Sequence, residues 1–214
     1  MQILPRDLAL SLLAGVTIAL LTAAQKKRRP VPTDGRLALL TLAMACAFSL
    51  TGVSPISGFH WEIRLSEISL VPFAGMRAML RQGFDLFACI NIVGNILLFA
   101  PLGVLVPRSF SGWDRLGRVA LLGFGTSLWI ECSQLFLSRS TDVDDLLLNT
   151  LGAVLGYAVW RVYDALLRRK NEPGRHSAAA QKPGSLSLAL CLLAPYAIIV
   201  AAGAYDRYCF FHVR

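Results

Sequence analysis

Charged residues are scarce in this sequence. Only 16% of its residues are Asp, Glu, Lys or Arg, whereas soluble domains average about 25%. Hydrophobic residues make up 55% of the chain, and its mean hydropathy is +0.57. The apolar residues also come in long blocks. This composition excludes an ordinary soluble domain and is typical of an integral membrane protein.

Common metal, disulfide and catalytic motifs are also missing. The five cysteines form no CxxC pair and their odd number argues against a disulfide framework, while the three histidines lie in separate segments and supply no zinc ligand set. The sequence contains no GxSxG, HExxH or GxxxxGK[ST] motif. We therefore expect no cofactor and no bound metal.

Six apolar blocks are long enough, or nearly so, to cross a bilayer, which needs about 20 residues per helix. They predict an all-α fold, a polytopic transmembrane helix bundle of about six spans. The blocks are Leu8–Ala24, Leu37–Val53, Cys89–Val106, Val119–Phe136, Leu146–Leu167 and Leu186–Ala204.

Basic residues are unevenly divided between the two sides of this predicted bundle. Three alternate connections, 25–36, 107–118 and 168–185, hold thirteen Lys and Arg residues, and the opposite side holds seven. The positive-inside rule then places both termini outside the cytoplasm. The net charge of +8 is explained by a membrane surface, so no nucleic-acid partner is expected.

Four regions follow from these boundaries. Residues 1–36 form an extra N-terminal span with a basic connection, and 37–167 form the main membrane domain. Residues 168–185 are a basic cytoplasmic linker, and 186–214 are a C-terminal span and tail. The stretch 54–88 mixes apolar and polar residues and predicts an interfacial loop over the outer helix ends.

Polar pairs on three spans converge at one membrane surface in this topology. Each pair is three or four residues apart, so its two members share a helix face. At about 1.5 Å rise per residue, all lie within about two turns of the outer surface. Charged groups at membrane depth are costly and usually mark function. The pairs are Asn91 with Asn95, Glu131 with Gln134, and Asp145 with Asn149.

Small residues continue these polar stripes into the membrane. Gly123 and Ser127 lie on the face of Glu131, and Gly152 and Gly156 form a GxxxG below Asn149. Small residues allow close helix approach in lipid. We therefore predict that the fourth and fifth spans form a tight antiparallel pair whose outer end opens into a polar pocket.

Plainer interpretations stand beside this one. Asp142 or Thr141 fits an N-cap, with Asp144 or Asp145 as the capping-box acid, and Glu131 could pair with Arg139 to join two helices. The asparagines could also hold neighbouring helices together through hydrogen bonds between them. The carboxylates could also hold Mg²⁺ or Ca²⁺, although the spacing of a calcium loop is missing.

A chemical interpretation uses the same side chains. Glu131, kept partly protonated by its apolar surroundings, could act as an acid with Asp145 as base, which makes these two the candidate catalytic residues. Arg139 could bind a phosphate or carboxylate with its planar fork. The other candidate substrate-binding residues are Asp142, Asn149, Gln134, Asn95 and Asn91.

Several segments resemble the VanZ-like family, known from teicoplanin resistance. The resemblance rests on Val71-Pro72-Phe73, on the segment Asn91–Ile96 with Phe99, Pro101 and Gly103, on Ser127, Glu131 and Gln134, and on an RxxDxxDxxxNTxG string that runs from Arg139 to Gly152. It implies a multi-pass protein of the bacterial inner (plasma) membrane, and one member of the family is associated with lowered sensitivity to glycopeptides. No established catalytic mechanism comes with it.

The leading hypothesis is an outward-facing polar pocket that engages membrane lipids, in particular a lipid-linked or cell-wall glycan precursor. The alternatives are an intramembrane enzyme that uses Glu131 and Asp145, and a structural or assembly protein whose polar cluster locks helices together.

Overall fold

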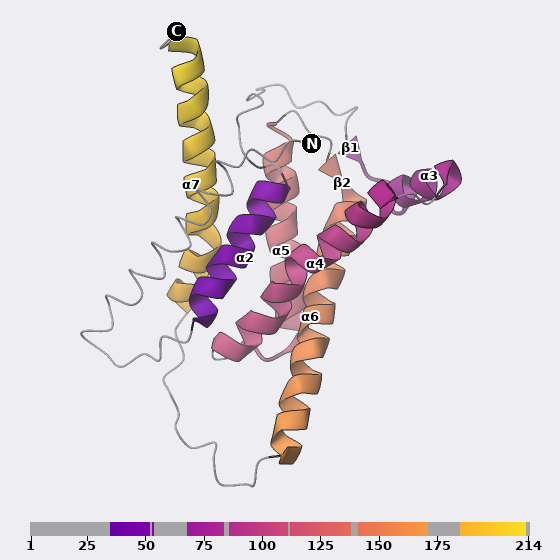
Figure 1. Cartoon of the computed structure of the whole chain (residues 1–214), viewed down its shortest axis with the longest axis vertical. Coiled ribbons are helices and arrows are strands. Elements are labelled where there is room, and N and C mark those ends of the chain that lie inside the picture. Colours follow the sequence, from indigo (N-terminus) through magenta and orange to yellow (C-terminus); the bar gives the residue numbers. More distant parts are fainter. Residues whose placement is uncertain are drawn as a thin grey trace, which may run out of the picture.

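The computed structural model describes residues 35–51, 53, 68–83, 86–110, 112–137, 141–170 and 185–212. These residues are mostly helical, as predicted (Figure 1). The helices are α2 (Arg36–Leu50), α3 (Ala74–Gln82), α4 (Leu86–Ser109), α5 (Leu116–Gln134), α6 (Val143–Lys170) and α7 (Ser185–His212), and the strands are β1 (Ile68–Ser69) and β2 (Thr141–Asp142).

Five of the six predicted spans coincide with helices, and the first, Leu8–Ala24, lies outside the described residues. Three helical stretches are long and apolar enough to cross a membrane: Ala88–Ser109, Val143–Leu167 and Ser187–Cys209. α2 is apolar but shorter than these three stretches. α5 is not among them, and its 19 residues include the charged Arg118 and Glu131. The described part of the chain therefore supports a membrane protein, while six spans and outward-facing termini stay predictions.

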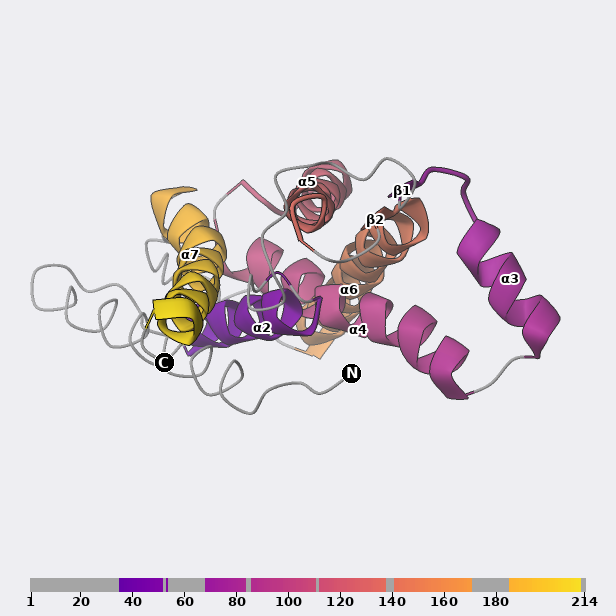
Figure 2. The same ribbon diagram turned by 90° about the horizontal axis from the view of Figure 1, so that it is seen from above.

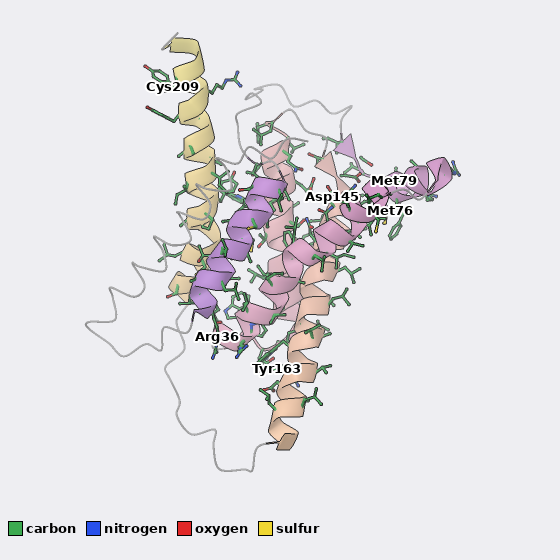
Figure 3. The ribbon with its side chains drawn as sticks, in the orientation of Figure 1. Arg36, Met76, Met79, Asp145, Tyr163 and Cys209 are labelled. Carbon is green, nitrogen blue, oxygen red and sulfur yellow. The ribbon has the colours of Figure 1, made fainter. Side chains whose placement is uncertain are left out.

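The described helices alternate in direction. In the view of Figure 1, α2, α5 and α7 run upward, whereas α4 and α6 run downward. The start of α2 meets the end of α4, where Arg36 Nη1 donates to the carbonyl oxygen of Arg108 at 3.4 Å. Figure 3 accordingly places Arg36 and Tyr163 at the lower end of the bundle and Asp145 at the upper end.

The closest helix pair is α4 with α6. A Cβ atom added at Gly152 would lie 2.2 Å from the carbonyl oxygen of Ile96, and one at Gly156 would lie 2.1 Å from that of Ala100. The backbones touch because glycine has no side chain at these positions. We expected the GxxxG to pair the fourth and fifth spans, which are α5 and α6. The predicted partner helix was wrong, because the GxxxG motif faces α4 and not α5.

α5 packs on a neighbouring face of α6 through a different glycine. A Cβ atom at Gly123 would lie 2.7 Å from Cβ of Ala153. α2 packs against α4, and α7 packs mainly against α2. Many large apolar side chains, among them Leu97 and Val159, are exposed on the outside of the bundle. Such a surface suits contact with lipid tails.

The interfacial segment contains regular structure that the sequence did not reveal. β1 pairs in parallel with β2, so that Ile68 lies opposite Thr141 and Ser69 opposite Asp142. α3 follows β1 and projects to the side of the bundle (Figure 2). Residues 74–82 were predicted as loop, yet they form a helix with Arg77 and Arg81 exposed and Met76 and Met79 partly buried.

The α4–α6 contact can be tested with two matched substitutions. Gly156→Ala should destabilise the protein by about 1–3 kcal/mol, because its new methyl group collides with the α4 backbone. Gly94→Ala on α4 meets nothing within 4 Å, so it should be neutral or stabilise by up to about 1 kcal/mol through helix propensity. Thermal unfolding in detergent measures both, and equal melting temperatures would contradict the proposed contact.

Candidate functional site

One face of α5 is buried and polar toward its C-terminal end. Ser127, Glu131 and Gln134 are 0%, 4% and 3% exposed, respectively. The prediction that these residues share a face with Gly123 is confirmed, since all four are among the buried residues of α5. The Glu131 side chain therefore points into protein and not toward lipid.

Glu131 joins the end of α5 to the start of α6. Its Oε2 accepts a hydrogen bond from the backbone N–H of Asp142 at 3.1 Å. The Thr141 hydroxyl donates to the backbone carbonyl of Glu131 at 3.3 Å. Both partners lie at β2, so the carboxylate is held at the point where the chain enters α6.

Asp142 occupies the N-cap position of α6. Its Oδ1 accepts a hydrogen bond from the backbone N–H of Asp144 at 3.0 Å, and α6 begins at the residue between them. A side-chain oxygen bonded to the second helical N–H is the usual N-cap arrangement. The plainer interpretation of Asp142 is therefore confirmed by geometry, whereas a role in substrate binding stays a prediction.

Asp144 belongs to the cluster, although we weighed it only as a capping acid for its own helix. It is 4% exposed, and its carboxylate accepts hydrogen bonds from the backbone N–H groups of Phe73 and Met76, the latter at 3.2 Å. It thus caps α3, a different helix. Phe73 has φ of 63°, an unfavourable left-handed conformation, which the bond to Asp144 helps to hold. Gly75 leaves the necessary space, since its Cβ would lie 3.2 Å from Asp144 Oδ2.

An amide and carboxylate chain links α4 to α6 at the same end of the bundle. Asn95 Nδ2 donates to Asp145 Oδ1 at 2.6 Å and to Asn91 Oδ1 at 3.3 Å. All three side chains are partly exposed. The predicted approach of Asp145 to the asparagines of the third predicted span is thus present in the structure.

Two buried amide oxygens have no hydrogen-bond partner among the residues that the structure describes. Asn149 is 1% exposed and donates from Nδ2 to Ser127 Oγ at 2.9 Å, while its Oδ1 is left without a donor. Gln134 donates from Nε2 to the carbonyl oxygen of Thr51 at 2.8 Å, and its Oε1 is likewise without a donor. Buried acceptors without donors are rare and call for an explanation.

Further predictions concern Arg139, a bound metal and a pocket. Arg139 lies outside the described residues, and so does any pairing with Glu131. Within the described ranges, no three His, Cys, Asp or Glu side chains gather as a metal site would require. Two hollows, of about 520 and 250 Å³, are lined mainly by apolar residues of α5 and α7 and by none of the polar cluster.

The comparisons with known proteins give one result. The sequence pattern of the family described as VanZ/LLP1 matches residues 36–166, which is more than half of the chain. This range contains every residue on which the resemblance to VanZ-like proteins rests. No curated protein and no solved structure gives a significant match.

Asp144 gives a direct test of the cluster as a structural lock. Asp144→Ala should destabilise the protein by about 1–3 kcal/mol, because two backbone N–H groups lose their acceptor. Asp144→Asn should cost less, since its one amide oxygen still accepts from one of these two N–H groups, which in the wild type bond to different carboxylate oxygens. Hydrogen exchange at the Phe73 and Met76 amides should accelerate in the order wild type, Asn, Ala.

Asp114→Ala is the matched control. The Asp114 carboxylate pairs with Arg161 at 3.1 Å, but the two side chains are 40% and 53% exposed, so solvent screens the pair. This change should leave exchange in α3 unaltered. Similar acceleration in Asp114→Ala would mean that Asp144 has no specific role in capping α3.

Proposed function

The chain belongs to the VanZ/LLP1 family, and on that premise we propose that it is a bacterial cell-envelope membrane protein that engages a lipid-linked cell-wall precursor. The proposed contact surface is the polar rim, which we define as Asn91, Asn95, Glu131, Asp145 and Asn149 at the upper ends of α4, α5 and α6. The ligand's headgroup binds at this rim while its lipid tail stays in the bilayer.

The charge distribution supports an outward-facing rim. The Lys and Arg residues at the helix ends opposite to the rim are Arg36, Arg108, Arg115, Arg118, Arg161, Arg168, Arg169 and Lys170. Those of the described residues at the rim end are Arg77, Arg81 and Arg207. Because basic residues favour the cytoplasmic side, this distribution favours a rim on the outer surface.

The observation that supports the proposal most directly is the hydrogen bonding and exposure of the polar groups at the rim. Asn95 and Asp145 form a partly exposed chain of donors and acceptors. Asn149 Oδ1, one turn after Asp145 on α6, is a buried acceptor to which none of the described residues donates. A ligand that carries hydroxyl and amide N–H groups, as glycans and peptides do, supplies donors to the partly exposed oxygens of Asn91 and Asp145.

α3 supplies cationic groups at the same end of the molecule. Arg77 and Arg81 are exposed on this helix, whose partly buried methionines suit a position at the membrane surface. Guanidinium groups bind phosphate oxygens through paired N–H donors. Arg77 and Arg81 therefore fit the phosphate linkage of a lipid-linked precursor.

Binding by the full-length protein in lipid nanodiscs tests this proposal. The probe is a polyprenyl-diphosphate-linked disaccharide-peptide, with phosphatidylglycerol as the comparison lipid. Asn95→Leu should weaken binding of the probe by about tenfold, as expected for the loss of a strong polar contact. Thr150→Val is the control, because the Thr150 hydroxyl is already bonded to the Leu146 carbonyl oxygen at 2.7 Å. Equal affinities of these two variants would contradict binding at the rim.

The enzyme alternative draws on the burial of Glu131, a carboxylate that is 4% exposed near the end of α5. Glu131→Gln separates the two functions, because the Gln oxygen can still accept the N–H of Asp142 but the side chain cannot transfer a proton. If the chain is an enzyme, turnover should fall by about 10²–10⁴-fold with unchanged probe binding. If it only binds, teicoplanin sensitivity of the expressing cells should match that of cells with the wild-type chain.

The structural alternative is favoured by the capping roles of Asp142 and Asp144. Under it, Glu131→Gln and Arg139→Gln should lower the melting temperature in detergent while probe binding and teicoplanin sensitivity stay at their wild-type values. Loss of probe binding at an unchanged melting temperature would exclude it.

A further inference from the structure

A long apolar groove lies between α5 and α7, on the side of α5 away from the polar rim. The two hollows that form it share Trp129 and Tyr196. The larger, of about 520 Å³, extends past Gly125 and Leu121 to Arg118. None of the rim residues lines either hollow.

The groove is open because α7 packs on α2 and makes little contact with α5. The two helices are joined at one level, where the Ser133 and Tyr196 hydroxyl groups lie 2.8 Å apart and the Trp129 and Tyr196 rings meet edge to face at 5.4 Å. Below this level Gly125 contributes no side chain. Leu121 and Leu193 on the two walls are 70% and 54% exposed.

The length of the larger hollow matches one leaflet of a bilayer. Arg118 and Trp129 are eleven residues apart on α5, which corresponds to about 16 Å at about 1.5 Å per residue. The hydrocarbon core of a bilayer is about 30 Å thick, so the groove spans about half of it. An acyl chain of a single leaflet has this reach.

Among the described residues that line the groove, one is charged, and it lies at the end of the groove. Arg118 lies one turn into α5, at the basic end of the bundle, and Trp113 lines the same end. Arg118 donates to the carbonyl oxygen of Gly112, and a guanidinium group has further N–H donors for an anion. Tryptophan favours the headgroup level of a membrane.

We infer that the groove between α5 and α7 binds an anionic phospholipid of the leaflet at the basic end. One acyl chain lies along Leu121, Gly125 and Trp129, and the phosphate group meets Arg118. The site is separate from the rim and does not depend on the function proposed for it.

Native mass spectrometry of the full-length protein with added phosphatidylglycerol or phosphatidylethanolamine tests this inference. The wild type should retain phosphatidylglycerol preferentially. Arg118→Gln should weaken its retention by about tenfold and remove the preference. Gly125→Leu should abolish it by filling the groove, and nothing within 4 Å of the new Cβ opposes folding of this variant.

Gly94→Leu is the matched control, because Gly94 also has nothing within 4 Å of an added Cβ and lies on α4, away from the groove. It should retain phosphatidylglycerol as the wild type does. Equal retention by Gly125→Leu and Gly94→Leu would overturn the site, and equal retention of both lipids by the wild type would overturn the role of Arg118.

A photoreactive amino acid in place of Leu121 identifies the occupant in membranes. A crosslinked phospholipid supports the inference. A crosslink to residues 8–24 of the same chain, or to a second copy of the chain, would overturn it, because the groove would then be a helix-packing site.

Discussion

The glycine-mediated contact between α4 and α6 is the constraint on which the rest of the structure depends. With Gly152 and Gly156 against the backbone of α4, the two helices lie close enough for short side chains to meet across them. This is why Asn95 reaches Asp145. Larger residues at these glycines would separate the helices and break the polar chain at the rim.

The acidic residues at the rim end divide into two groups with different physical roles. Glu131, Asp142 and Asp144 accept backbone N–H groups at the starts of α6 and α3. These bonds satisfy donors that helix N-termini leave free and fix three chain segments together. Asp145 faces an amide side chain and is partly exposed, so it is the carboxylate best suited to meet a ligand.

α5 separates two environments. Its buried face carries Ser127, Glu131 and Gln134 toward the other helices, and its opposite face carries Leu121, Gly125 and Trp129 along the apolar groove. The polar face ends at the rim, whereas the groove leads to Arg118 at the other end. α5 thus has a polar face on one side and an apolar face on the other, and the apolar face ends at a positively charged residue.

The sequence by itself determined the helical class, the approximate bounds of α2, α4, α5, α6 and α7, and the polar face of α5, because apolar block length and 3.6-residue periodicity are local properties. The sequence also identified the family, because its motifs can be recognised without coordinates. Only the tertiary structure decided which helix the GxxxG of α6 meets, that residues 74–82 form a helix capped by Asp144, and that β1 pairs with β2. These features depend on contacts between residues some 50 to 70 positions apart, such as Asn95 with Asp145 and Phe73 with Asp144. A stripe of small residues shows that a helix can pack closely against another helix, and an aspartate at a helix start shows that it can accept backbone N–H groups. Many partners satisfy each of these local patterns. Packing of the whole chain selects one of them.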